Sequence, residues 1–225
     1  MSRLPWLSAS DPPDAFPPTT SALKEPPGLL AIGGDLSPER LLAAYARGIF
    51  PWFSPGEAVL WWAPQPREVI LPQCFHTSRS LLRTLQRGRL RITCDQAFDA
   101  VVALCAAPRA RSAGTWITDA MRAAYVALHE LGHAHSIEVW QGTALVGGVY
   151  GVQVGRVFCG ESMFSRVSDA SKVALHAVLC GGALGPIELL DCQMPSAHLR
   201  SLGSQPMPRG EFERWLQAAQ GAIGN

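Results

Sequence analysis

Apolar and polar positions along the chain follow two periods, which together predict a mixture of helices and strands. Apolar residues recur at helical spacing in six segments, at residues 38–48, 77–87, 97–106, 119–131, 170–180 and 209–219. Alternating or wholly apolar runs predict strands at residues 67–71, 90–93, 136–140, 144–152, 157–160 and 187–194. Helices interspersed with such strands indicate an α/β (α+β) protein built around a mixed sheet.

The first quarter of the chain has a different character. Residues 1–27 are rich in Pro and Ser and predict an extended lead-in. Ser37 suits the N-cap of the first helix, Pro38 suits its first position, and Gly48 can end it. An aromatic loop stiffened by prolines follows and contains Trp52. We therefore expect a small N-terminal domain at residues 1–63 and a larger domain at residues 64–225.

Composition excludes some classes of protein. The net charge of +1 and a pI near 7.7 argue against a nonspecific nucleic-acid binder that is basic overall, although a local patch could still bind one. The sequence contains neither a membrane-spanning apolar stretch nor the apolar core of a signal peptide, so we expect a cytoplasmic protein. Six cysteines without close pairing lie mostly in apolar runs and predict buried, reduced thiols.

Asp191 and Gln193 are the most informative polar pair. They stand one residue apart in the apolar run 187–194, and a strand's period of two directs both side chains to one face, with Cys192 on the other. Burying an ionised carboxylate is costly unless a partner compensates it, so the pair has either a functional role or a place on a half-solvated strand.

A second candidate is the segment around Glu161. An apolar strand ends at Gly160 and Glu161, a loop with Met163 and Phe164 follows, and Ser168 can cap the next helix. Strand, loop and helix would form a pocket. Glu161 could bind a cation or an amine at its rim, or it could pair with a surface arginine.

The stretch from His129 to His133 reads H-E-x-x-H, the pattern of a zinc site on a continuous helix. Here Gly132 resembles a C-terminal cap, and a strand follows directly. We therefore favour histidines near a helix C-terminus, where positive charge is stabilising, over a zinc ligand set.

Basic and aromatic residues suggest nucleic-acid binding. Arg79, Arg83 and Arg87 recur every four residues on one predicted helix, and such a stripe could follow phosphates or be a solvated face. Trp52 and Trp116 lie in loops flanked by Gly or Pro and could stack on bases or pack as lids.

Taken together, these motifs resemble the leucyl/phenylalanyl-tRNA–protein transferase family. The resemblance covers most of the chain from about residue 23 to the last helix. The matching segments are residues 28–37, 45–54, 114–118, 129–140, 158–165 and 190–193. It implies an enzyme that transfers Leu or Phe, and Met more weakly, from aminoacyl-tRNA to the N-terminal Arg or Lys of a protein and thereby marks that protein for degradation. It also implies a small N-terminal domain beside an N-acetyltransferase-like catalytic domain, without metal, cofactor or membrane.

The resemblance further implies roles for individual residues. Asp191 and Gln193 would be the catalytic pair, and Glu161 would bind the acceptor. The terminal adenosine of the tRNA would contact Tyr45, Trp52 and Trp116, and the acceptor stem would contact Arg79, Arg83 and Arg87. The aminoacyl pocket would be lined by Phe158, Met163, Ser165, Leu175 and Leu190. On this basis we expect the Gln193 carbonyl to orient the attacking amine while Asp191 holds the amide.

Three alternatives remain at this level. A zinc peptidase would need metal at residues 129–133. A non-catalytic tRNA-binding module would account for the arginines and tryptophans but leave Asp191, Gln193 and Glu161 without a task. An acyl-CoA-dependent acetyltransferase would need a glycine-rich pyrophosphate loop, where residues 162–171 stand instead.

Overall fold

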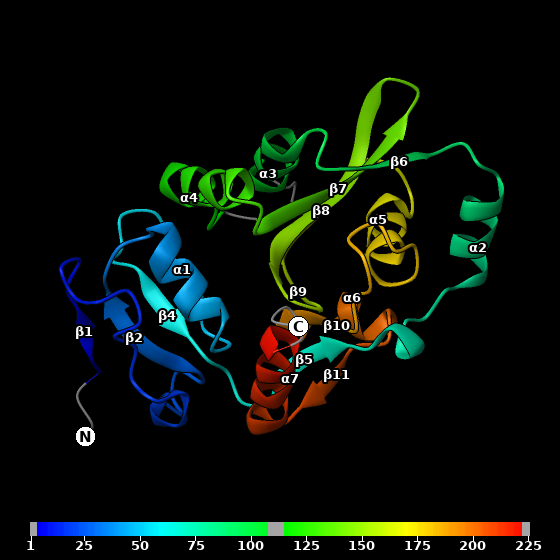
Figure 1. The fold of residues 1–225 in the computed structure, drawn as a ribbon. Coiled ribbons are helices and arrows are strands. Elements are labelled where there is room, and N and C mark those ends of the chain that lie inside the picture. Colours follow the sequence, from blue (N-terminus) through cyan, green and yellow to red (C-terminus); the bar gives the residue numbers. More distant parts are fainter. Residues whose placement is uncertain (1–3, 108–114, 222–225) are drawn as a thin grey trace.

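The computed structural model describes residues 4–107 and 115–221 and contains two sheets (Figure 1). The smaller sheet has the strand order β1-β2-β4-β3, and the larger has the order β11-β5-β10-β9-β8-β7-β6. The smaller sheet comprises β1 (Trp6–Leu7), β2 (Leu29–Gly33), β3 (Phe50–Pro51) and β4 (Leu60–Trp62). The larger comprises β5 (Arg67–Ile70), β6 (Arg91–Cys94), β7 (Ala134–Gln141), β8 (Ala144–Val154), β9 (Val157–Ser165), β10 (Leu189–Gln193) and β11 (Gln205–Met207).

Helices cover both faces of the larger sheet. The helices are α1 (Pro38–Tyr45), α2 (Arg79–Gln86), α3 (Phe98–Ala106), α4 (Asp119–Glu130), α5 (Ala170–Leu179), α6 (Ala197–Ser201) and α7 (Arg209–Gly221), with 3-10 turns at Thr19–Ser21 and Pro72–Cys74. Helix α5 packs on β7, β8 and β9 and contacts α2, whereas α3, α4 and α7 pack on the other side of the sheet (Figure 1). In the ranges described, no helix is long and apolar enough to cross a membrane.

The expected mixed α/β architecture is confirmed. The six predicted helices are present, and the hydroxyl of Ser37 accepts a hydrogen bond from the Arg40 backbone N–H at 3.4 Å as an N-cap should. The boundary near residue 63 stays a prediction. It falls between β4 and β5, which belong to different sheets, although one hydrophobic cluster extends through both parts of the chain.

Three expectations from the sequence are wrong. The aromatic segment after Gly48 is not only a loop, because β3 and β4 pair within it as part of the N-terminal sheet. Strand β9 runs on to Ser165, so Met163 and Phe164 lie in a strand rather than in a loop. The cysteines are free, but not all are buried, since Cys74 and Cys180 are exposed.

Two bulges open the larger sheet at its centre. Strands β9 and β10 pair in parallel only as far as Cys159 and Asp191. Beyond that point Glu161 is an extra residue in β9 relative to β8, and Cys192 is an extra residue in β10 relative to β5. Gln193 then adopts a left-handed φ of 63°. The two neighbouring strands thus separate where Glu161 and Gln193 stand.

Gly151 makes the bulge in β9 possible. It lies opposite Gly160, and a Cβ at Gly151 would come within 2.2 Å of the Cys159 carbonyl oxygen. No other residue fits this close approach of two backbones without displacing one of them.

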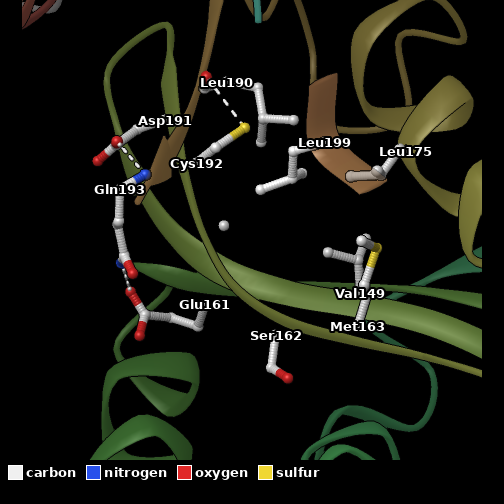
Figure 2. Close-up of a pocket in the computed structure, with 11 residues that line it drawn as sticks. Val149, Glu161, Ser162, Met163, Leu175, Leu190, Asp191, Cys192, Gln193 and Leu199 are labelled. Atoms are coloured by element: carbon white, nitrogen blue, oxygen red, sulfur yellow. Dashed lines mark hydrogen bonds between the residues drawn. The ribbon is translucent and has the colours of Figure 1, made fainter. Parts of the chain in front are cut away.

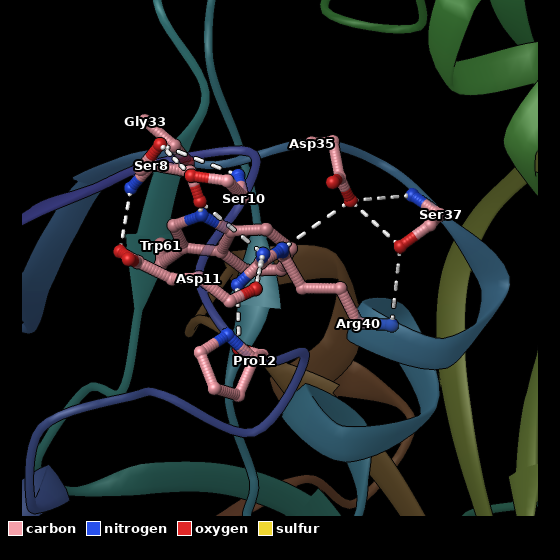
Figure 3. Close-up of polar contacts among 9 residues, drawn as sticks. All are labelled: Ser8, Ser10, Asp11, Pro12, Gly33, Asp35, Ser37, Arg40 and Trp61. Atoms are coloured by element: carbon pink, nitrogen blue, oxygen red, sulfur yellow. Dashed lines mark hydrogen bonds and ion pairs between the residues drawn. The ribbon is translucent and has the colours of Figure 1, made fainter.

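Arg40 fixes the N-terminal segment to α1 (Figure 3). Its side chain is 1% exposed, and its Nε donates to Asp35 at 3.2 Å. The guanidinium also donates to the carbonyl oxygens of Ser8, Asp11 and Pro12 at 2.9 to 3.3 Å. Arg40 and Tyr45 lie on the same helix, so these contacts attach the N-terminal segment to the helix that positions Tyr45.

Replacing Arg40 with alanine is expected to lower the free energy of unfolding by about 3 kcal/mol, because it leaves several carbonyl groups and Asp35 without their donor. Denaturant unfolding measures this change. Arg166→Ala is the matched control, since that exposed side chain has no hydrogen-bond or ion-pair partner within the described ranges, and its expected effect is below about 0.5 kcal/mol. Equal effects of the two variants would contradict the assignment.

Candidate active site

Glu161 is the centre of a polar cluster at the opening between β9 and β10. Its Oε1 accepts hydrogen bonds from the Tyr45 hydroxyl and from Nε2 of Gln193, both at 2.6 Å. Its Oε2 lies at hydrogen-bond distance, 2.6 Å, from the Tyr125 hydroxyl oxygen. The two tyrosine hydroxyls also lie 2.8 Å from each other. Residues from α1, α4, β9 and β10 therefore converge on one carboxyl group.

The environment of Glu161 makes its protonation sensitive to pH near neutrality. Burial raises its pKa from the ordinary 4.5 to about 7, against the hydrogen bonds from Tyr125, Tyr45 and Gln193, which lower it. The charge of Asp191 adds to the increase. Burial also raises the pKa values of Tyr45 and Tyr125 well above 10, so both phenols keep their protons.

Asp191 is wholly buried and forms an ion pair with an arginine. Nε and Nη2 of Arg67 each lie 2.7 Å from a carboxylate oxygen of Asp191, in a bidentate arrangement. Nη1 of Arg67 donates to the Gly48 carbonyl at 3.0 Å, and the guanidinium carbon lies 4.7 Å from the ring centroid of Phe50 and 4.8 Å from that of Phe212. Asp191 is thereby joined to the N-terminal part of the chain and to α7.

Asp191 and Gln193 do not interact as the sequence predicts. Oδ1 of Asp191 accepts from the backbone N–H of Gln193 at 2.8 Å, so it fixes the main chain of Gln193, whereas the side-chain amide is held by Glu161 (Figure 2). The bulge at Cys192 is the physical reason, because it interrupts the alternation of faces. Cys192, expected on the opposite face, lines the same pocket as Gln193.

A pocket of about 120 Å³ adjoins the polar cluster. Figure 2 shows its polar end at Glu161, Gln193 and Asp191 and its apolar end around Leu175 and Met163. The other lining residues are Val149, Gly160, Ser162, Leu190, Cys192 and Leu199. An apolar cavity beside a few convergent polar groups is the usual form of a small-molecule site.

The predicted aminoacyl-pocket residues are partly brought together. Met163, Leu175 and Leu190 line the pocket. Phe158 is fully buried in the hydrophobic cluster that also contains Leu175 and Leu190, and Ser165 lies at the end of β9 in a neighbouring pocket that shares Met163.

The three residues predicted to contact adenosine differ in how exposed they are. Trp52 is 42% exposed and packs against Trp62 with ring centroids 5.5 Å apart, and Trp116 is partly buried. Gly114, part of the motif around Trp116, lies outside the described residues. Tyr45 is 1% exposed, and its hydroxyl is engaged with Glu161, so it faces the polar cluster rather than solvent. Its contact with adenosine stays a prediction.

The predicted phosphate-binding arginines lie along α2 and at its C-terminal end, where Arg87 is the cap residue. Arg79, Arg83 and Arg87 are all exposed, and in the part of the chain that the structure describes none of them has an ion pair. Among the described residues nothing neutralises this stripe, which leaves three cationic groups available to a ligand.

The H-E-x-x-H stretch does not form one helical face. Helix α4 ends at Glu130, and Gly132 adopts a positive φ of 77° before β7 begins. The ring of His129 stacks on Phe98, and its Nδ1 lies 2.8 Å from the Ala134 carbonyl oxygen. Among the described residues no group of three metal-ligating side chains is arranged to hold an ion.

Sequence reasoning missed Arg67 and Tyr125. A signal for Tyr125 was present, because it occupies a core position of an amphipathic helix, and a buried tyrosine needs a partner for its hydroxyl. Arg67 opens a short strand whose four residues are all buried, which marks a charged residue that must find a counter-charge. The sequence could not show that this counter-charge is Asp191.

Comparisons with known proteins agree with the motifs. The family model described as leucyl/phenylalanyl-tRNA protein transferase matches residues 69–217, and the model of its N-terminal domain matches residues 34–65. The chain belongs to the leucyl/phenylalanyl-tRNA–protein transferase family. It is therefore an aminoacyltransferase, and the family resemblance expected from the sequence is confirmed.

Individual relatives align with nearly the whole length of this chain. The protein of Edwardsiella ictaluri is 58% identical over 90% of this chain and 81% of its own length. That of Ectopseudomonas mendocina is 54% identical over 95% of this chain and 94% of its own. Both are called leucyl/phenylalanyl-tRNA–protein transferases. A GCN5-related N-acetyltransferase from Kribbella flavida is similar to 74% of this chain, over 60% of its own, with a TM-score of 0.34 and 10% identity, too slight a likeness to bear on function.

Proposed function

We propose that this transferase moves leucine or phenylalanine, and methionine more weakly, from aminoacyl-tRNA in the cytoplasm to the N-terminal Arg or Lys of proteins, which are thereby marked for degradation. The observation that supports it most is the pocket between β9 and β10, where an apolar cavity suited to an aminoacyl side chain adjoins the carboxyl group of Glu161 and the side-chain amide of Gln193. A cation and an apolar group can thus be held side by side.

Glu161 is suited to bind the acceptor. A carboxylate offers about four acceptor positions, and three are filled by Tyr45, Tyr125 and Gln193. The remaining position can accept from the α-amine or the cationic side chain of an N-terminal Arg or Lys. A neutral N-terminal residue such as alanine has no cationic side chain to add to this contact.

Gln193 is suited to orient the attacking amine. Its Nε2 donates to Glu161, and its carbonyl oxygen, which has no hydrogen-bond partner among the described residues, can accept an N–H from the α-amine. A carboxamide is too weakly basic to take a proton, so its contribution is orientation. The neutral amine attacks the ester carbon, the C–N bond forms, and the C–O bond to the ribose breaks. The ribose oxygen leaves with the proton that the nitrogen loses.

Asp191 acts through Gln193 as a positioning residue. It holds the Gln193 backbone N–H at 2.8 Å, and its charge is balanced by Arg67 at 2.7 Å. The ion pair is buried, so it fixes the Asp191 carboxylate in place against the Gln193 main chain.

The apolar end of the pocket accounts for the choice of amino acid. Side chains such as those of Met163, Leu175 and Leu199 reject charged aminoacyl groups by desolvation. Base identity in the tRNA body should matter little, because phosphate contacts and stacking contain little sequence information.

The arginine stripe on α2 supplies a test of tRNA binding. Replacing Arg79, Arg83 and Arg87 together with alanine should weaken leucyl-tRNA binding and reduce the slope of log K against log salt by about 0.7 to 0.9 for each phosphate that the variant no longer neutralises. Equilibrium binding at several salt concentrations measures this. Arg156→Ala is the control, because that exposed arginine is paired with Glu188. An unchanged slope in the triple variant would place the tRNA elsewhere.

The proposed reaction is tested by transfer of labelled leucine from leucyl-tRNA to peptides. Peptides that begin with Arg or Lys should accept the label, and an otherwise identical peptide that begins with Ala should not. Equal labelling of all three peptides, or of none, would refute the proposal.

A further inference from the structure

The carboxyl group of Glu161 and the hydroxyl groups of Tyr45 and Tyr125 form a closed ring of three oxygen–oxygen contacts. They join Oε1 to the Tyr45 hydroxyl at 2.6 Å, this hydroxyl to that of Tyr125 at 2.8 Å, and the latter to Oε2 at 2.6 Å. Each distance is that of an O–H···O hydrogen bond, and each such bond needs one proton. Two phenols supply only two protons.

An ionised Glu161 would therefore leave one contact of the ring without a proton. If both phenols donate to the carboxylate, the two phenol oxygens face each other at 2.8 Å with lone pairs only. If Glu161 is a neutral acid, three protons fill three contacts. Because Nε2 of Gln193 donates to Oε1, the carboxyl proton belongs on Oε2, from which it is donated to Tyr125, then Tyr125 donates to Tyr45 and Tyr45 to Oε1.

We propose that Glu161, Tyr45 and Tyr125 share three protons in the resting enzyme, so that Glu161 is neutral and ionises when a cationic acceptor N-terminus binds beside it. The second half of this statement rests on the proposed function. The proton from Oε2 leaves to solvent, and the carboxylate that remains binds the acceptor cation.

The charges around Glu161 agree with a neutral acid. Its pKa of about 7 means that the acid and carboxylate forms are close in free energy near neutrality. The titratable groups that face it from the surrounding elements are Tyr45 on α1, Tyr125 on α4, Tyr150 on β8, Cys159 on β9, and the paired Arg67 and Asp191 on β5 and β10. Burial raises the pKa of Cys159 and of all three tyrosines, so these groups stay uncharged. The cation in this group, Arg67, is already paired with Asp191.

The resting state is tested by infrared difference spectroscopy of the enzyme between about pH 6 and about pH 8.5. Ordinary carboxyl groups are ionised throughout this range, so the C=O stretch of a protonated carboxyl at the lower pH should come from Glu161. Glu161→Gln keeps the ring, because an amide N–H replaces the carboxyl O–H, and it should lack the band. Tyr150→Phe is the matched control and should keep it. Absence of the band from the wild-type enzyme would overturn the proposal.

The matched control depends on the isolation of Tyr150. Its ring packs edge-on against Tyr125 with centroids 5.3 Å apart. In the part of the chain that is described, its hydroxyl is the single buried side-chain polar atom without a hydrogen-bond partner. Removing that hydroxyl therefore changes the packing around the ring by one atom and leaves the three hydrogen bonds of the ring in place.

Stability gives a second readout that does not depend on activity. Because the pKa of Glu161 is raised in the folded protein, the neutral acid stabilises the fold fully below about pH 4.5, and this contribution is lost as the pH rises through about 7. Denaturant unfolding should therefore show wild type losing stability relative to Glu161→Gln across this range. If the difference in stability between wild type and Glu161→Gln stayed constant with pH, this would contradict a protonated ring.

The acceptor link is tested on the same proteins. Adding an Arg-initiated peptide at about pH 6 should abolish the infrared band. In the transfer assay the peptide KM should increase about tenfold per unit as the pH falls below 7, in wild type and in Tyr150→Phe but not in Glu161→Gln, whose KM should be high throughout. A band that survives saturating peptide overturns the link. Failure of the wild-type enzyme to transfer leucine would refute the proposed function, while the infrared and unfolding data would still test the ring.

Discussion

Replacing Asp191 with alanine is expected to lower the free energy of unfolding by about 3 to 5 kcal/mol, because it leaves the buried guanidinium of Arg67 without its counter-charge. Transfer should be lost as well. Asp191→Ala alone therefore cannot separate a role in the reaction from a role in folding. Denaturant unfolding measures the first effect and steady-state transfer of leucine the second.

The double variant Arg67→Met/Asp191→Leu separates the two roles. Replacing a buried ion pair by apolar side chains of similar size is often close to neutral, so stability should return to within about 2 kcal/mol of wild type. Turnover should stay about a hundredfold low, because the Gln193 backbone N–H still lacks the acceptor that fixes it. Recovery of both stability and turnover would mean that Asp191 has a structural role only.

Replacing Gln193 with leucine is expected to reduce turnover by about a hundredfold while leaving stability and leucyl-tRNA binding nearly unchanged. The side chain is partly exposed at the pocket, its amide donates to Glu161, and in the proposed reaction its carbonyl oxygen orients the attacking amine. Leucine keeps the approximate size but removes the oxygen that orients the amine. Gln217→Leu on α7, an exposed glutamine, is the matched control. A fall in tRNA affinity as large as the fall in turnover would assign Gln193 to donor binding.

Much of the fold could be predicted from the sequence because its helices bury residues at helical spacing, and the longer strands of the larger sheet contain continuous buried runs. The helical spacing of Leu41, Leu42 and Tyr45, with Ser37 and Pro38 before them, predicts α1 correctly. The N-terminal sheet could not be found in this way. Its strands have two to five residues, and β2 and β4 are joined by pairing between distant segments rather than by an alternating pattern.

The members of the site could be predicted in part, but their arrangement could not. Asp191, Gln193 and Glu161 can be recognised from their residue types in apolar surroundings and from the family resemblance. Their partners depend on contacts between segments more than a hundred residues apart, such as Tyr45 with Glu161 and Arg67 with Asp191. The bulges at Glu161 and Cys192 also redirect side chains, and a periodic pattern contains no signal for an inserted residue.

The most direct test of the account is single-turnover transfer of labelled leucine from enzyme-bound leucyl-tRNA to an Arg-initiated peptide, with wild type and Gln193→Leu side by side. Both proteins should bind the donor equally. Wild type should transfer the label, and the variant should do so about a hundredfold more slowly. Equal rates in the two proteins would contradict the claim that the cluster of Glu161 and Gln193 beside the apolar pocket is the site of peptide-bond formation.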